Sequence, residues 1–314
     1  MHTFTIVIPV KPGGVVRALV PLRQIDYPPQ LFEVLIAEGR QPSRQRNLAA
    51  AGALGDILYF LDDDSAVRPD CLTRLNEHYS RGDIVAVGGP SLTPAGDTPL
   101  QRAVGVALGS RLGGGGVRNR YRQTGEVRRT DDRELILCNL SFRRDVFLAA
   151  GGLDERLYPN EENELMDRLL ASHRTLLHDP GLAVCRSQRP TLKAFCRQIF
   201  GYGRGRAEQT LLSRRINLGS LLPAFFVIYL CLLPLVRMPL ALLPLSAYAA
   251  LVCAYAMSSG QPGIFARLLV ILPLLHICYG IGFLAGLCRP RFRSAPAAPA
   301  EVSIKIVKPM GALW

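Results

Sequence analysis

Residues 55–65 read GDILYFLDDDS, an apolar run that stops abruptly at three aspartates. A short apolar run bounded by polar residues is typical of a buried strand, so we expect a strand over residues 56–61. Asp62, Asp63 and Asp64 then lie at its carboxyl end. Adjacent carboxylates repel one another unless a cation is close, and Mg²⁺ or Mn²⁺ prefer oxygen ligands. The stretch therefore favours a site for a divalent metal and a diphosphate over the alternative, a cap on the next helix.

Strands and helices are expected to alternate around this stretch. The predicted strands are residues 3–10, 32–37, 83–87 and 134–138, and the predicted helices are a segment from Val15, residues 43–54, a segment opening near Pro69 and residues 160–171. This alternation predicts an α/β fold with a mostly parallel sheet and helices on both faces. Such sheets bind ligands at the carboxyl ends of their strands. The KPGG loop at residues 11–14 and the three aspartates both fall at that edge.

Residues 109–133 are rich in glycine and arginine and show no apolar periodicity. We expect a mobile loop here, without regular structure. Arg118, Arg120 and Arg122 in this loop either close over a bound ligand or face solvent, and the solvated arrangement is favoured.

An acidic helix is expected to begin near Asn160, in the sequence NEENEL at residues 160–165. On this helix Glu161 and Glu164 share a face, whereas Glu162 points elsewhere and is free to face a cleft. A carboxylate there can deprotonate a hydroxyl as a general base. Acids in a first helical turn are also favoured by the helix dipole, and the pattern alone favours that explanation.

The last hundred residues differ in composition from the rest of the chain. The chain carries a formal net charge of +12, yet residues 216–288 contain no Asp, Glu or Lys. Apolar stretches in this region each approach the ~20 residues that cross a bilayer as a helix. They are residues 216–236, 239–257 and 264–288. A buried helical core is the alternative, but the lack of an acidic face favours a membrane region, with Arg237 in a tight interfacial turn.

We therefore expect an α/β domain at residues 1–210, a membrane region at residues 211–293 and a tail at residues 294–314. Residues 1–10 lack the basic segment and long apolar core of a signal peptide, so the α/β domain is expected in the cytosol. Arginines flank both ends of the membrane region and favour the cytoplasmic side, so one segment is expected to be re-entrant or interfacial. The basic excess of the α/β domain is modest, and nucleic acid is not an expected partner.

Five short blocks, in this order, resemble the family 2 glycosyltransferases. They are IVIPV at residues 6–10, QRNL at residues 45–48, GDILYFLDDDS at residues 55–65, GGLDE at residues 151–155 and ENEL at residues 162–165. The resemblance covers about residues 3–210. The membrane region, with HxxYGxGF at residues 276–283, is similar to that of succinoglycan-type exopolysaccharide glycosyltransferases.

The resemblance implies a GT-A fold and an inverting hexosyltransferase that acts in cell-surface glycan synthesis. It implies a cytosolic nucleotide-sugar donor, Mg²⁺ or Mn²⁺ as cofactor, a lipid-linked or polysaccharide acceptor, and contact with membrane lipids. The location implied is the bacterial inner membrane. The QxxRW motif of processive synthases is absent, since the only tryptophan is Trp314, which favours transfer of one sugar per encounter.

The matching positions assign roles at the donor site. The resemblance makes Asp64 the main metal ligand, with Asp62 as a second ligand nearer the ribose, and places Asp63 and Pro9 beside the donor. Arg46 is implied near the phosphates.

Two positions depart from the aspartates usual in the family. Glu38 takes the place of the aspartate that contacts the nucleobase, and Glu162 takes that of the general base, with Glu161 as the second candidate. These replacements are the support for an alternative function, a catalytically degenerate membrane scaffold that binds nucleotide sugar.

Other residues are candidates for phosphate or acceptor binding. Arg204 and Arg206 can bind a diphosphate or a lipid phosphate, because guanidinium groups suit phosphate oxygens. Attraction to anionic lipid head groups, worth about 1 kcal/mol for each basic residue, is an equal alternative. Gly152, in the GGLDE block, is a further candidate. His276 is expected to make a polar contact between helices.

Overall fold

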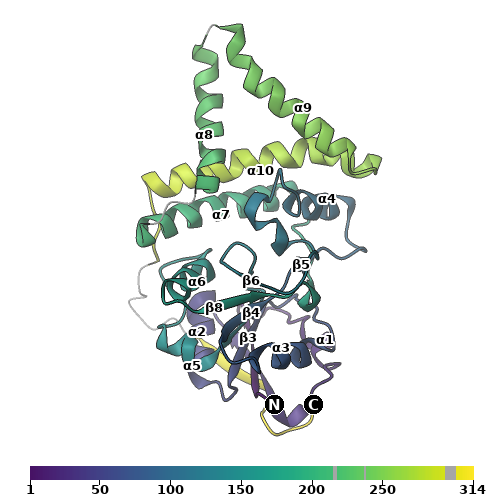
Figure 1. Cartoon of the computed structure of the whole chain (residues 1–314), viewed down its shortest axis with the longest axis vertical. Coiled ribbons are helices and arrows are strands. Elements are labelled where there is room, and N and C mark those ends of the chain that lie inside the picture. The colour runs from purple at the N-terminus through teal and green to yellow at the C-terminus, as the bar shows by residue number, and fades with distance from the viewer. Residues whose placement is uncertain (215–217, 237, 294–301) are drawn as a thin grey trace. The chain divides into compact units, whose positions relative to one another are not determined.

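The computed structural model describes residues 1–214, 218–236, 238–293 and 302–314. These residues form two compact units, each built from separate segments of the chain (Figure 1). The first contains Met1–Leu92, Asn119–Arg186 and Arg293–Trp314, and the second contains Thr93–Arg118 and Ser187–Phe292. The predicted turn at Arg237 and the start of the first apolar stretch at residue 216 lie outside the described residues.

The first unit is built on an eight-stranded sheet in the order β10-β2-β1-β3-β7-β4-β8-β6. Its strands are β1 (Phe4–Val10), β2 (Phe32–Glu38), β3 (Ile57–Leu61), β4 (Ile84–Gly88), β6 (Arg128–Thr130), β7 (Asn139–Arg143), β8 (Thr175–His178) and β10 (Ser303–Lys308). β2, β1 and β3 are parallel neighbours, as are β4 and β8, whereas β7, β6 and β10 pair antiparallel. A small second sheet pairs β5 (Ser91–Leu92) with β9 (Val184–Cys185). The predicted α/β fold with a mostly parallel sheet is confirmed.

Helices cover both faces of this sheet, and each face has its own apolar core. One core combines β-strand residues such as Ile6 and Tyr59 with α1 (Leu19–Leu22) and α3 (Cys71–Tyr79). The other combines residues such as Val7 and Phe60 with α2 (Pro42–Gly52), α5 (Arg144–Ala149) and α6 (Glu161–Ala171). Side chains alternate between the two faces of a strand. Because both faces are covered, the strands read as continuous apolar runs.

The predicted strand at residues 134–138 is wrong, and so is the helix predicted from Val15, since α1 is a single turn that begins only at Leu19. Residues 134–138 form turns, and the strand that follows is β7. The sequence did not predict β7 because it contains polar residues. Asn139 and Ser141 are nevertheless buried in the sheet. Asn139 Oδ1 accepts a hydrogen bond from the Tyr59 hydroxyl at 2.7 Å, and the Ser141 and Tyr79 hydroxyls lie 2.9 Å apart. Buried polar side chains in a strand are tolerated where they are hydrogen-bonded in this way.

The C-terminal residues supply an edge strand that the sequence did not predict. β10 pairs antiparallel with β2, with Ser303 opposite Glu38. Lys308, at the end of β10, is buried, and its Nζ donates to the backbone oxygen of Phe32 at 2.6 Å. An added strand covers backbone groups that β2 would otherwise expose.

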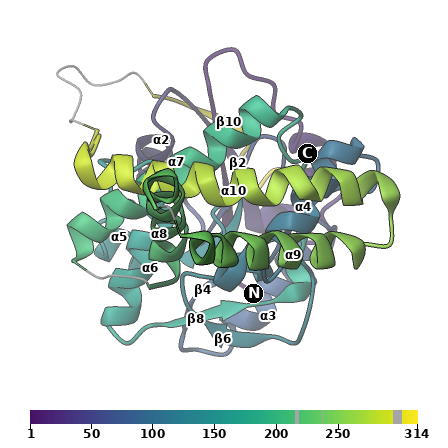
Figure 2. The same cartoon turned by 90° about the horizontal axis from the view of Figure 1, so that it is seen from above.

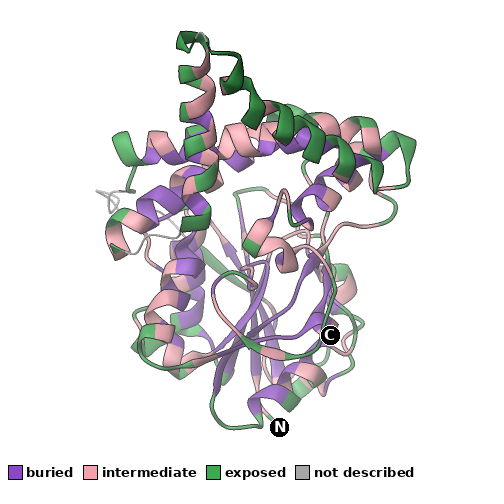
Figure 3. Cartoon of the chain, turned by 45° about the horizontal axis from the view of Figure 1, so that its top comes forward, coloured by how far each residue is buried: buried purple, intermediate pink, exposed green. Residues whose placement is uncertain are grey.

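The second unit is helical. It contains α4 (Pro99–Leu108), α7 (Leu192–Ser213), α8 (Leu218–Leu232), α9 (Leu243–Met257) and α10 (Pro262–Cys288), with short 3₁₀ turns, η4 (Leu233–Leu235) and η5 (Pro239–Leu242), beside α8 and α9. Three apolar segments among the described residues are long enough to cross a membrane, at Leu218–Leu235, Pro239–Met257 and Pro262–Cys288. These agree with the three predicted stretches. Much of the surface of α8 and α9 is exposed in the structure (Figure 3), as expected for helices that face lipid.

A polar contact joins the helices of this unit, as predicted for His276. Nδ1 of His276 on α10 lies 2.7 Å from the Tyr248 hydroxyl on α9, and Nε2 lies 2.9 Å from the backbone oxygen of Leu112. The ring thus satisfies both nitrogens among apolar helices, where an unpaired polar group would be costly.

Glycines let α7 and α10 pack closely along their length (Figure 2). A Cβ on Gly282 of α10 would overlap the backbone oxygen of Phe200, and a Cβ on Gly203 of α7 would overlap that of Tyr279. Small residues at such contacts allow helix backbones to approach closely in membrane proteins.

The substitution Gly282→Ala is expected to destabilise the helical unit by about 1–3 kcal/mol, because overpacking forces the two backbones apart. Thermal unfolding of the full chain in detergent measures the effect. Gly201→Ala is the matched control on α7, because nothing lies within 4 Å of a Cβ at Gly201. That variant should be as stable as the unsubstituted chain or slightly more so, since alanine favours a helix by up to about 1 kcal/mol over glycine. Equal stability of the two variants would contradict the packing argument.

Candidate active site

The carboxyl ends of β1, β2 and β3 meet at one edge of the sheet, because these strands are parallel neighbours. Val10 at the end of β1 is opposite Glu38 at the end of β2, and Pro9 is opposite Ala37. Gln45 of α2 fixes this edge, since its Nε2 donates to the backbone oxygens of Val10 and Ala37 at 2.8 and 2.5 Å. Pro9 and Glu38 are both partly exposed there.

The aspartates follow β3 at the same edge, in a turn that its own hydrogen bonds hold. The backbone N–H of Asp62 donates to Ser65 Oγ at 3.2 Å, and Ser65 Oγ donates to the backbone oxygen of Cys138 at 3.1 Å. The N-cap of α3 is Asp70. Residues 62–65 therefore do not cap that helix, and this alternative interpretation of the aspartates is wrong.

Arg186 contacts two of the three aspartates. Its Nε lies 2.6 Å from Asp64 Oδ1, and its Nη2 lies 3.0 Å from Asp62 Oδ2. Arg186 follows β9, whose Cys185 exchanges two backbone hydrogen bonds of 2.9 Å with Ala66, just beyond the aspartates. The two carboxylates thus share one guanidinium group.

Arg186 is not among the residues that the sequence predicts for this site. The strand just before it, β9, has two residues, too few to show any periodicity. The feature that could have identified Arg186 is its position just after the carboxyl end of a strand. That strand is recognised only once its pairing with β5 is known.

Arg46 of α2 connects the aspartates with α6. Its Nη2 donates to Asp62 Oδ1 at 2.9 Å, and its Nη1 lies 3.7 Å from Glu161 Oε1. Arg46 and Glu161 are both buried, with side chains 5% and 3% exposed. The structure therefore brings together two acidic clusters that lie about a hundred residues apart in the sequence.

The first turn of α6 holds Glu161 and Glu162 in different surroundings. Burial, with the charge of Glu162 adding to it and Arg46 opposing it, raises the pKa of Glu161 to about 8. The Glu162 side chain is 12% exposed, and its Oε1 lies 4.0 Å from Arg120 Nη1. Glu164 forms a separate ion pair of 2.7 Å with Arg168. Glu161 and Glu164, which the helical spacing puts on one face, therefore have different partners, Arg46 and Arg168.

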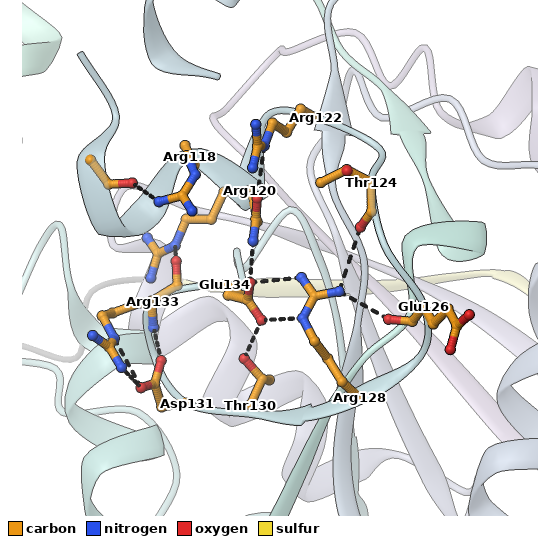
Figure 4. A network of polar contacts seen from close by, with 12 residues as sticks. Arg118, Arg120, Arg122, Thr124, Glu126, Arg128, Thr130, Asp131, Arg133 and Glu134 are labelled. Atoms are coloured by element: carbon orange, nitrogen blue, oxygen red, sulfur yellow. Dashed lines mark hydrogen bonds and ion pairs between the residues drawn. The ribbon is translucent and has the colours of Figure 1, made fainter. Parts of the chain in front are cut away.

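Arg120 belongs to a network of polar contacts rather than to a solvated loop (Figure 4). Its Nε donates to the backbone oxygen of Arg133 at 3.0 Å, and its Nη2 donates to Asn163 Oδ1 of α6 at 2.5 Å. Nearby, Arg128 pairs with Glu134 at 2.7 Å. These contacts tie residues 119–134 to the start of α6.

The sequence predicted that residues 109–133 lack regular structure, and this prediction is wrong. The stretch contains a 3₁₀ helix, η2 (Gly115–Arg120), and β6. Arg118 Nη1 donates to the backbone oxygen of Gly115 at 2.8 Å, and Arg122 Nε donates to Asn119 Oδ1 at 2.8 Å. Arginine side chains hold this stretch by hydrogen bonds to backbone oxygens and to polar side chains. Such contacts give no apolar periodicity, so the sequence did not predict the structure.

The GGLDE block is packed against α2. Asn47 exchanges hydrogen bonds of 2.9 Å with the backbone of Leu153. Gly152 has φ of +69°, and a Cβ there would lie 2.6 Å from Asn47 Oδ1. These constraints explain the glycine, while its predicted role toward phosphate or acceptor stays a prediction. The same holds for Arg204 and Arg206, which lie on α7 in the second unit.

The aspartates fit a metal ion only if a ligand completes its coordination. Among the described residues, no group of three or more His, Cys, Asp or Glu side chains is placed to hold a metal ion. Asp62 and Asp64 do converge on a single cation, the guanidinium of Arg186. Mg²⁺ is commonly bound by one or two carboxylates, with waters and substrate phosphates as the other ligands. The pair suits that kind of site.

Comparisons with known proteins agree with this fold. Residues 16–148 match the family described as Glycosyl transferase family 2. The chain is 30% identical over 249 residues to the succinoglycan biosynthesis protein ExoA of Rhizobium meliloti, covering 76% of this chain and 72% of that protein.

The fold resembles that of a solved glycosyltransferase structure. The mannosyltransferase PcManGT from Pyrobaculum calidifontis, solved with GDP-Man and Mn²⁺, superposes with a TM-score of 0.59 at 12% identity over 86% of each chain. TarS from S. aureus, solved with UDP, gives a TM-score of 0.45 at 12% identity over 99% of each chain. The fold has the GT-A architecture that the sequence predicts. The extent of the match to ExoA and the matched family together show that the chain belongs to the family 2 glycosyltransferases.

Proposed function

We propose that this chain is an inverting glycosyltransferase that moves a hexose from a nucleotide-sugar donor to a lipid-linked or polysaccharide acceptor in cell-surface glycan synthesis. One observation carries the proposal: the line of contacts from Asp64 through Arg186, Asp62 and Arg46 to Glu161. It joins a carboxylate cluster suited to a metal and a diphosphate with a helix that supplies a base.

The donor is held at the edge formed by β1, β2 and β3. Pro9 and Glu38 lie at the ends of adjacent strands, where the nucleoside binds, and Asp63 lies in the turn beside them. Arg46 stabilises the diphosphate through its guanidinium group. Asp64 and Asp62 would hold Mg²⁺ or Mn²⁺, which would supply positive charge to offset that of the leaving diphosphate.

Glu162 is the general base in this proposal. A carboxyl group whose pKa is about 8, as in Glu161, keeps its proton at pH 7 and cannot accept another. Glu162 is the more exposed of the two and is positioned by Arg120. It takes the proton of the acceptor hydroxyl, and the hydroxyl oxygen attacks the anomeric carbon as the nucleoside diphosphate leaves from the opposite side, which inverts the configuration.

The helical region fastens the enzyme to the bilayer that supplies its acceptor. We propose a catalytic region at residues 1–210 in the cytosol and a membrane region at residues 211–293 in the bacterial inner membrane. Its relative ExoA is named as a protein of succinoglycan biosynthesis. Arg204 and Arg206 are proposed to bind the phosphate of a lipid-linked acceptor or anionic lipid head groups.

The substitution Asp64→Asn is expected to reduce sugar transfer at least 100-fold, because one carboxylate of the metal site is lost. The assay uses the full chain in lipid nanodiscs, a panel of UDP- and GDP-sugars, a bacterial lipid extract as acceptor, and Mn²⁺ or EDTA. EDTA should abolish turnover. Asp145→Asn, at an exposed site on α5, is the control and should keep full activity. Turnover in EDTA at the rate seen with Mn²⁺ would contradict the metal site.

The substitution Glu162→Gln is expected to lower transfer about 10²–10⁴-fold while donor binding is kept, because only the proton acceptor is removed. Binding of the donor by calorimetry and transfer to the lipid extract are measured in parallel. Glu126→Gln, at an exposed position, is the matched control. If the unsubstituted chain binds donor but neither hydrolyses nor transfers it, the chain is a nucleotide-sugar-binding scaffold rather than an enzyme.

The substitution Glu161→Gln is expected to raise the melting temperature above that of the unsubstituted chain. The difference between the two chains should grow from about pH 5 to about pH 8. An unfolded glutamate releases its proton near pH 4.3, whereas folded Glu161 keeps its proton to about pH 8. The unfolded chain therefore binds fewer protons in this window, and the stability of the unsubstituted chain falls as the pH rises. Glutamine does not titrate, so its advantage should vanish near pH 4.5 and be constant above pH 8. Thermal unfolding of both chains between pH 5 and 9 tests this; an advantage independent of pH would refute it.

A further inference from the structure

Arg186 occupies the position between two carboxylates that the proposed function gives to a metal ion. Its Nε and Nη2 contact Asp64 and Asp62 at 2.6 and 3.0 Å. The second oxygen of Asp62 accepts from Arg46 at 2.9 Å. Both oxygens of Asp62 are thus paired with guanidinium groups. The repulsion between neighbouring acids is balanced by the protein's own cations.

The backbone of Arg186 is fixed by hydrogen bonds, whereas its side chain borders the solvent. The N–H of Arg186 donates to the backbone oxygen of Leu92 at 2.9 Å, and Cys185 is bonded to Ala66 on the other side. Arg186 and Asp64 side chains are 21% and 36% exposed, so the ion pair borders the solvent-facing edge of the site. The guanidinium therefore lies where a ligand from solvent can reach it.

The diphosphate of a nucleotide-sugar donor can compete with the aspartates for this guanidinium. Arginine binds phosphate oxygens through two parallel hydrogen bonds, and this diphosphate carries two negative charges, as many as the Asp62 and Asp64 carboxylates together. A donor at this edge would therefore draw Arg186 off Asp62 and Asp64 and free their oxygens for a divalent ion.

We propose that Arg186 is an internal counter-ion that blocks the metal position of Asp62 and Asp64 until a nucleotide diphosphate binds. The inference rests on the proposed function, since it requires the donor diphosphate at this edge. Arg186 is then a positioning residue with two effects. It weakens the binding of metal alone, and it strengthens the binding of the diphosphate, so metal and donor enter together and metal without donor is disfavoured.

A purely structural ion pair would behave differently. If Arg186 only stapled β9 to the aspartate turn, its removal would lower stability without favouring metal. Removal of a cation from a site that takes a cation must instead raise the affinity for Mn²⁺, whatever happens to stability.

The test measures Mn²⁺ binding to the full chain in nanodiscs without nucleotide, by electron paramagnetic resonance of free Mn²⁺. Arg186→Gln is expected to bind Mn²⁺ at least ten-fold tighter than the unsubstituted chain. Arg186→Lys keeps the charge and should bind Mn²⁺ as weakly as the unsubstituted chain. Arg189→Gln, an exposed arginine three residues further on, controls for the loss of one positive charge and should also leave Mn²⁺ affinity unchanged.

The second measurement is the binding of UDP and of GDP at saturating Mn²⁺, by calorimetry. The nucleotide that binds the unsubstituted chain is expected to bind Arg186→Gln at least ten-fold more weakly. Mn²⁺ affinity that is the same in Arg186→Gln and the unsubstituted chain would overturn the inference. Should Arg186→Gln fail to fold, Arg186→Met and Arg186→Ser, which also lack the charge, replace it in both measurements.

The outcomes separate this inference from the proposed function. If UDP or GDP binds with Mn²⁺ but Arg186→Gln leaves metal affinity unchanged, the counter-ion role is wrong and the donor site stands. If neither nucleotide binds with Mn²⁺ to any of these chains, the donor site itself is wrong and the inference falls with it.

Discussion

The site depends on the charge balance around Asp62. This carboxylate lies between two guanidinium groups, one from Arg46 on α2 and one from Arg186 after β9. Three adjacent acids at the end of a strand are unfavourable by themselves, and burial, with the charges of Asp64 and Asp62 adding to it, raises the pKa of Asp63. The arginines make the cluster stable in a folded protein. They also connect it with the first turn of α6, through the contact of Arg46 with Glu161.

The sheet makes this arrangement possible. Parallel neighbours end at the same edge, so the loops after β1, β2 and β3 share one side of the unit. One of the two apolar cores holds both α2 and α6 against the same face of the sheet, which brings Arg46 within reach of both acidic clusters. The arginine-rich stretch at residues 119–134 completes the site, because Arg120 bonds to Asn163 and lies beside Glu162. Polar contacts rather than apolar packing set the position of α6's first turn.

The helical unit has different physical requirements. Its apolar helices have exposed surfaces that lipid can cover, and within the unit α7 and α10 approach through glycines that leave no room for a side chain. Its described polar contacts include the bonds of His276 to Tyr248 and to the backbone of Leu112. The proposed lipid-linked acceptor would diffuse in two dimensions beside an enzyme attached in this way.

The sequence by itself determined the α/β alternation, the apolar helices and the family, because these follow from hydrophobic periodicity and from short blocks in a fixed order. It also identified the aspartates at the end of β3 and the acids at the start of α6 as candidates. Only the tertiary structure placed β7, whose buried Asn139 and Ser141 look exposed in a linear reading, and β10, which is isolated in the sequence from the sheet it joins. The sequence also did not predict the role of Arg186 at this site. Its partners lie more than a hundred residues away, and an ion pair between distant segments leaves no periodic trace, because only the folded backbone decides which charges meet.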